Sequence, residues 1–281
     1  MESGTSSENS ICSADKGGRI FRAVFLDIDG TLVNSSGGPF AEDLEQIEAA
    51  RRRGCRFFLN TGRSFALVPR ELRDAPYIDG ISAGGGAHIL VREDGKLVSV
   101  YHSRVPGDLL RAAAALYIET GKWCIFEGES NIYVFNREAC TLHIEDYLPV
   151  EREDDFEVKY PGAPVTKITL EGPSPGEKEM RLLGGAFHFF SQRTYHEGII
   201  QGENKARGME IILDRLGIPR EESIAIGDSA NDVEMIRFAG LGAAMGNACD
   251  ELKKASRFIT ASCGEGGIAR VLRKYVVQDL G

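Results

Sequence analysis

Residues 23–31 read AVFLDIDGT, a short apolar run followed at once by two acids, a glycine and a threonine. The apolar part predicts a buried parallel strand whose carboxyl end opens into a functional loop. Because side chains alternate along a strand, we expect Asp27 and Asp29 to leave the sheet on the same side and share one small site. Two carboxylates that close repel each other unless a proton or a divalent cation lies between them, and a metal is the better expectation. An ordinary acidic turn is the structural alternative.

The next two residues suit the same loop. Gly30 lets the backbone turn with positive φ and expose N–H groups, and Thr31 adds a hydroxyl donor for phosphate oxygens.

Around this strand, helices and strands alternate. A helix over 40–53 and a strand over 56–59 follow it, and the same rhythm resumes near residue 204. There we expect a helix to Leu216, a strand over 223–226, a helix over 231–239, a strand over 242–245 and a closing helix from 267. This pattern predicts an α/β fold with a Rossmann-like parallel sheet.

The middle of the chain has a different texture. A hairpin over 88–101, with an Asp-Gly turn, precedes a helix over 107–120 and short strands near 123–126, 132–135 and 167–170, with an acidic loop at 151–157. We therefore predict an inserted α+β domain at 87–196, a catalytic core at 20–86 and 197–281, and a disordered tail at 1–19.

Two further strand ends carry polar residues. Thr61 and Gly62 end the strand over 56–59, where a hydroxyl and backbone donors could face an anion. Asp228 and Asp232 open the helix that follows the strand over 223–226, although capping of that helix would explain Asp228 equally well. Since ligands of open α/β sheets bind outside the carboxyl ends of strands, we expect these ends to converge.

The expected cluster of Asp27, Asp29 and Asp228 offers only hard oxygen ligands, which suit Mg²⁺ and disfavour zinc. A positive charge is also needed near a transferring phosphoryl group. Lys205 is the candidate, because it opens a helix where the chain re-enters the predicted core.

Composition narrows the partners. The net charge of −9 argues against nucleic acid and anionic membranes as partners, and a small phosphorylated metabolite as substrate would need local positive charge. Six cysteines show no CxxC pair, which favours reduced thiols and a cytoplasmic protein. Oligomeric state stays open.

Four stretches together resemble the haloacid dehalogenase superfamily, and in particular its Cof-type phosphatase branch with a large α+β cap. They are DIDGTL at 27–32, NTGR at 60–63, GDSANDVEMI at 227–236 and GEGGIARVL at 264–272. In that branch the cap is inserted between the second and third motifs, where the predicted insertion lies here.

The resemblance implies a role for each residue. Asp27 would attack phosphorus, and Asp29 would protonate the leaving oxygen and then activate water. Thr61 and Lys205 would hold the phosphoryl oxygens. The implied site residues are completed by the Mg²⁺ ligands and their neighbours: Asp27, the Asp29 backbone carbonyl and Asp228, with Asp232 in support and Asn231 near the phosphate.

Two departures from the family pattern leave the catalytic groups intact: Gly85 stands where asparagine is frequent, and Ala206 where glycine is frequent. The alternatives are a phosphomutase or phosphotransferase on the same scaffold, a non-catalytic regulatory member, and, more weakly, a nucleotide-binding dehydrogenase. Substrate choice would rest with the inserted domain, whose candidates are Trp123, Phe126, Glu127, His143, Arg193, Tyr195 and His196.

Overall fold

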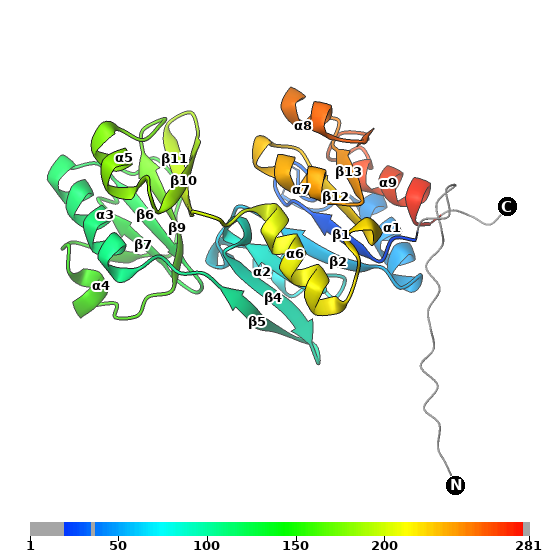
Figure 1. Ribbon diagram of the computed structural model, residues 1–281, viewed down its shortest axis with the longest axis horizontal. Coiled ribbons are helices and arrows are strands. Elements are labelled where there is room, and N and C mark those ends of the chain that lie inside the picture. Colours follow the sequence, from blue (N-terminus) through cyan, green and yellow to red (C-terminus); the bar gives the residue numbers. More distant parts are fainter. Residues whose placement is uncertain (1–19, 35–36, 278–281) are drawn as a thin grey trace, which may run out of the picture. The chain divides into compact units, whose positions relative to one another are not determined.

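The computed structural model describes residues 20–34 and 37–277, and Figure 1 shows the course of the chain. The chain forms two compact units. The first combines the chain up to Phe58, Pro76–Asp79 and the chain from Leu213 onward, and the second contains Leu59–Ala75 and Gly80–Ile212. The predicted tail at 1–19 lies outside the described residues. The predicted core and cap boundaries stay a prediction.

The first unit is built of parallel strands and helices. Its strands lie side by side in the order β14, β13, β12, β1, and each neighbouring pair is parallel. The strands are β1 (Ala23–Leu26), β12 (Ser223–Gly227), β13 (Leu241–Ala244) and β14 (Phe258–Ile259). The helices are α1 (Ala41–Arg52), α7 (Val233–Phe238), α8 (Asp250–Ala255) and α9 (Gly267–Tyr275).

Burial explains why these segments form a sheet. Every residue of β1, β12 and β13 is buried, as apolar runs covered on both faces should be. Helix α1 carries acids in its first turn and arginines in its last, which suits the helix dipole. It packs against α9, and α7 packs against α8 (Figure 1).

Two elements continue from one unit into the other. They are β2 (Arg56–Asn60) and α6 (Lys205–Leu216).

The second unit contains two groupings of strands, in which every pair except one is antiparallel. The first is β3 (Gly80–Ala83), β4 (His88–Glu93) and β5 (Lys96–His102), paired in that order. Asp94 and Gly95 turn the β4–β5 hairpin with φ of 48° and 79°, as an Asp-Gly turn requires. The short helix α2 (Arg70–Arg73) precedes β3 in the chain.

The other grouping is a six-stranded sheet in the order β10, β11, β9, β6, β7, β8. Its strands are β6 (Cys124–Gly128), β7 (Ile132–Phe135), β8 (Leu148–Val150), β9 (Val165–Glu171), β10 (Phe187–Ser191) and β11 (Tyr195–Ile200). Strands β7 and β8 form the parallel pair. The helices of this grouping are α3 (Gly107–Thr120), α4 (Asp155–Val158) and α5 (Glu177–Leu183). Helices α3 and α5 lie against one face of this sheet (Figure 1), and the core there includes Tyr117, Phe126 and Leu183.

The predicted fold class is confirmed: the first unit has the Rossmann-like parallel sheet and the middle of the chain is α+β. One local expectation needs correction, since part of the acidic loop expected at 151–157 is the helix α4. Within the described residues, no helix combines the length and apolar character that crossing a membrane would take.

Candidate active site

The carboxyl end of β1 holds the first site residues. The Asp27 N–H donates to the Ile226 carbonyl at 3.0 Å, which ties the end of β1 to β12. The Asp27 side chain is buried, whereas Asp29 is exposed. Between Asp29 and Thr31 the chain turns at Gly30, whose φ is 79°. A Cβ at Gly30 would overlap the Asp228 carboxylate, so this turn admits glycine for reasons of both backbone conformation and space.

The carboxyl end of β12 holds the second group. The buried Asp232 accepts the N–H groups of Asp228 at 3.0 Å and Ser229 at 2.9 Å. Ser229 begins a 3-10 turn over Ala230–Asp232 and completes a capping box with Asp232. The expected capping is therefore present, but Ser229 and Asp232 form it. The Asp228 side chain is not part of this capping box.

Asp228 turns toward the end of β1. The Thr31 hydroxyl donates to Asp228 Oδ1 at 3.2 Å. One ligand atom from each of Asp27, Asp228 and Asp232 lies within 4.8 Å of the others. We call these three residues the carboxylate group. They are negative groups at close quarters, an arrangement that a cation or a shared proton stabilises.

The donor chemistry fits a hard divalent cation. Every atom that the carboxylate group offers is an oxygen, as Mg²⁺ or Ca²⁺ prefers. The Asp29 carboxylate is not one of the group, so any part for Asp29 in metal binding would fall to its backbone carbonyl. The Thr31 hydroxyl has one proton and gives it to Asp228 here, so the predicted contact of Thr31 with phosphate requires that hydroxyl to rotate.

Asn231 is partly exposed and points into the same turn, where its Oδ1 accepts the Ser229 hydroxyl at 2.7 Å. Its place near a phosphate stays a prediction.

The remaining predicted residues belong to the second unit, which brings them together. Thr61 and Lys205 are both almost fully buried. The Asn60 side chain donates to the Lys205 carbonyl at 2.9 Å, joining the end of β2 to the start of α6. The Thr61 hydroxyl accepts the Arg63 N–H at 3.1 Å, which shapes the turn at Gly62. That Thr61, Gly62 and Lys205 reach the carboxylate group stays a prediction.

Sequence reasoning missed one residue beside the carboxylate group. Asn247 donates to the Gly30 carbonyl at 2.9 Å and accepts the Cys263 N–H at 2.8 Å. It follows β13 by a few residues, so the rule that directed attention to the ends of β1 and β12 would have found it.

A buried charge was also missed. Lys167, in β9, contacts the carboxylates of Glu127 and Glu197, and its Nζ donates to the Gly62 carbonyl at 3.2 Å. The two carboxylates raise the pKa of Lys167 in spite of its burial, so the ammonium is held in its charged form.

The expected specificity residues fall into two kinds. Trp123, Phe126, Glu127 and His196 are buried, with His196 Nδ1 2.8 Å from the Gly172 carbonyl, and Tyr195 is partly exposed, so a contact of these residues with substrate stays a prediction. His143 and Arg193 are exposed and remain available to a ligand.

A parallel sheet with acids gathered at two of its strand ends is the arrangement of a hydrolase with a Rossmann-like core and carboxylate side chains in its site. The family model of the haloacid dehalogenase-like hydrolases matches residues 24–272, and the chain belongs to this family. It is a phosphatase-type hydrolase of that family.

Relatives span nearly the whole chain. The 5-amino-6-(5-phospho-D-ribitylamino)uracil phosphatase YitU of Bacillus subtilis is 27% identical, over 90% of this chain and 96% of its own length. A phosphoglycolate phosphatase of Methanothermobacter thermautotrophicus is 26% identical, over 91% of this chain and 99% of its own. The solved structure of the subclass IIB sugar phosphatase BT4131 has a TM-score of 0.76 and 29% identity, and covers 90% of this chain and 98% of that chain.

Proposed function

We propose that this chain is a Mg²⁺-dependent phosphomonoesterase of a small phosphorylated metabolite, a sugar phosphate or a related acid. The observation that carries the proposal is the carboxylate group, whose ligand atoms lie within 4.8 Å of one another at two strand ends. Such a group concentrates negative charge, and its oxygen atoms suit a divalent cation that meets a phosphate.

In this proposal Asp27 is the nucleophile. Its carboxylate attacks phosphorus while the bond from phosphorus to the leaving oxygen breaks, and the leaving oxygen takes a proton from Asp29. Asp29 then accepts a proton from water, the water oxygen attacks phosphorus, and the bond to Asp27 breaks to release inorganic phosphate. The carboxylate group and the Asp29 backbone carbonyl would hold Mg²⁺, whose chemistry there would be to neutralise charge on the phosphoryl oxygens. The exposure of Asp29 supports a residue that exchanges protons with substrate and water.

Residues of the second unit are proposed to bind the phosphoryl oxygens. The Lys205 ammonium neutralises their charge, and the Thr61 hydroxyl and the Gly62 N–H donate hydrogen bonds, with Asn231 adding a contact from the first unit. The hydrogen bond from Asn60 to the Lys205 carbonyl supports this proposal, since it holds the start of α6 beside the turn at Gly62.

The names of relatives support a small phosphorylated substrate. One acts on a phosphoribitylamino-uracil, one on phosphoglycolate, and one is a sugar phosphatase. These share a phosphate on a small polar molecule, and the net charge of −9 gives no general attraction for larger polyanions.

The test is phosphate release from a panel of sugar phosphates, phosphoglycolate and nucleotides, with Mg²⁺ and with a chelator. We expect turnover that needs Mg²⁺ and is lost in Asp27→Asn, a nearly isosteric change that removes the nucleophile. The matched control is Asp250→Asn, an exposed acid in the first turn of α8, which should retain wild-type rates. Persistent activity in Asp27→Asn would overturn the role of Asp27.

The same assay separates the alternatives. A phosphotransferase would pass phosphate to an added sugar hydroxyl and give a new phosphate ester in place of inorganic phosphate. A regulatory member would release nothing from any compound although it is folded. The cytoplasmic location is likewise proposed, and fractionation of cells would test it.

A further inference from the structure

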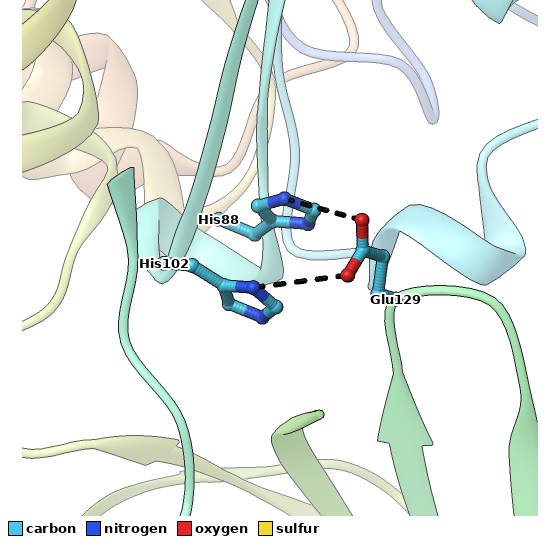
Figure 2. A group of neighbouring side chains, drawn as sticks. All are labelled: His88, His102 and Glu129. Atoms are coloured by element: carbon cyan, nitrogen blue, oxygen red, sulfur yellow. Dashed lines mark ion pairs between the residues drawn. The ribbon is translucent and has the colours of Figure 1, made fainter. Parts of the chain in front are cut away.

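Three side chains of the second unit combine metal-binding chemistry outside the carboxylate group. His88 begins β4 and His102 ends β5, where the two residues are directly paired across the strands. Glu129 follows β6, in the turn toward β7. Figure 2 shows the two imidazoles face to face, with the Glu129 carboxylate beside both.

The distances from the two imidazoles to the Glu129 carboxylate are too long for hydrogen bonds and leave a space between the three groups. His88 Nε2 lies 4.0 Å from Glu129 Oε1, and His102 Nδ1 lies 3.8 Å from Glu129 Oε2. Both exceed a hydrogen bond. Ligand atoms about 2.0–2.1 Å from a tetrahedral Zn²⁺ stand about 3.4 Å apart, so these gaps need to close by only a few tenths of an ångström.

One ring movement is required. The ring centroids are 4.0 Å apart with an angle of 14° between planes, and lone pairs in nearly parallel planes do not meet at one point. Binding of one ion by both rings would therefore require the His102 ring to rotate about its last side-chain bond, which turns its lone pair toward the space beside Glu129. His102 has more room than His88, since 10% of its side chain is exposed and none of that of His88.

Metal binding requires neutral imidazoles whose nitrogen lone pairs are directed at the ion. His88 Nδ1 and His102 Nε2 are buried and have no hydrogen-bond partner among the described residues, so the polar contacts of the two rings fall on the nitrogens that face Glu129.

Two neighbouring side chains contact the ring nitrogens that face Glu129. The Ser99 hydroxyl lies 3.1 Å from His88 Nε2, and Arg104 Nε donates to His102 Nδ1 at 3.4 Å. Ser99 and Arg104 are exposed, so both can turn toward water. Arg104 opposes a cation through its charge as well, which makes it a useful probe.

We propose that His88 Nε2, His102 Nδ1 and the Glu129 carboxylate form a second metal site, which takes Zn²⁺ or a similar borderline divalent ion. Two imidazoles and one carboxylate favour this class over Mg²⁺, which separates the site from the carboxylate group. Three protein ligands leave one position for water. A bound ion would join the β4–β5 pair to the turn that follows β6, both within the second unit.

The test is Zn²⁺ binding to the full chain, measured by competition with a chromogenic chelator in excess Mg²⁺. The measurement is repeated in an Asp228→Asn variant, whose carboxylate group should bind metal more weakly. Zn²⁺ that this variant still binds is assigned to the second site. We expect one Zn²⁺ per chain, and Co²⁺ in its place should give the visible absorption of a four-coordinate ion. Zn²⁺ should also raise the melting temperature.

Variants locate the site. Glu129→Gln and His102→Gln should each weaken Zn²⁺ binding by more than about tenfold, since changes even to outer partners of metal ligands reach that size. Glu129 is partly exposed, so its variant should fold, and circular dichroism checks this. Arg104→Ala should tighten binding. The matched control is His143→Ala, which removes an exposed histidine 3.3 Å from Glu145. This variant should leave the affinity for Zn²⁺ unchanged.

The proposal fails on either of two results. One is wild-type protein that binds no Zn²⁺ beyond what the carboxylate group takes. The other is Zn²⁺ affinity in folded Glu129→Gln and His102→Gln equal to that of the parent chain.

Discussion

The hydroxyl of Thr31 donates to Asp228 Oδ1 at 3.2 Å, and so joins the ends of two parallel strands that lie almost two hundred residues apart in the chain. Strands β1 and β12 are direct neighbours, with Leu26 paired to Ile226. The residues just beyond each strand are therefore brought together by the sheet itself. The relative position of the carboxylate group therefore depends on sheet register, because Asp27 follows β1 while Asp228 and Asp232 follow β12.

Asp228→Asn should raise the Mg²⁺ concentration needed for half-maximal phosphate release by about tenfold or more, because a ligand oxygen and a negative charge are lost. The Thr31 hydroxyl keeps an acceptor in the asparagine oxygen, so the fold should be little affected. Initial rates over a Mg²⁺ titration measure the shift. Asp250→Asn serves again as the exposed control, and an unchanged Mg²⁺ requirement in Asp228→Asn would contradict the metal role.

Gly30→Ala should destabilise the protein and abolish activity, whereas Gly95→Ala should only destabilise it. Both glycines have a φ of 79°, so both alanines incur the same left-handed strain of about 1–2 kcal/mol. At Gly30 the added Cβ also overlaps the Asp228 carboxylate, while at Gly95 it meets open space. Urea unfolding and phosphate release on both variants test this pair. Equal activity in the two would show that the turn at Gly30 tolerates displacement of Asp228.

Lys167→Met should lower the free energy of unfolding by about 3–5 kcal/mol, because Glu127 and Glu197 would lose their shared cation in a buried setting. Adding Glu197→Gln should restore part of the loss. Lys178→Met is the matched control: its ion pair with Glu119, 2.7 Å long, is exposed, and its removal should change stability by less than about 1 kcal/mol. Chemical denaturation of all variants at one pH provides the comparison. No recovery in the double variant would argue against charge as the cause.

Asp43→Asn should change how stability depends on pH. Burial raises the pKa of Asp43, the nearby Glu42 adds to this, and the Ala269 N–H at 2.7 Å and Arg273 oppose it. A pKa raised by folding means that the folded protein binds the proton more tightly. The contribution is therefore fully present below the unfolded pKa of about 3.9 and is lost as pH rises through the folded value.

The stability of wild type relative to Asp43→Asn should thus increase as pH falls from 7 toward about 4. Urea unfolding of both proteins across this range measures the difference. A difference between wild type and Asp43→Asn that stays level across this range would disprove the assignment.

Local patterns predicted many elements closely. The first strand and the helix over 107–120 were predicted at the bounds of β1 and α3, and the hairpin was placed by its Asp-Gly turn. Each of these depends on nearby residues alone: an apolar run, a helical spacing or a turn type. Between residues 148 and 200 only one strand was predicted, while β8, α5, β10 and β11 were not. Their local signals are weak: β8 has three residues and α5 has seven, and β10 and β11 form a hairpin whose turn at 192–194 contains no glycine.

The candidate site divides in the same way. The amino-acid sequence was enough to identify the acids at the ends of β1 and β12, because two acids after a buried strand are a local signal and parallel strands end at the same edge. Tertiary structure alone brought Asn247 to the Gly30 carbonyl, placed Lys167 between two carboxylates, and set Glu129 beside His88 and His102. No local sequence pattern links the segments that make these contacts. Packing of the folded chain decides which of them meet.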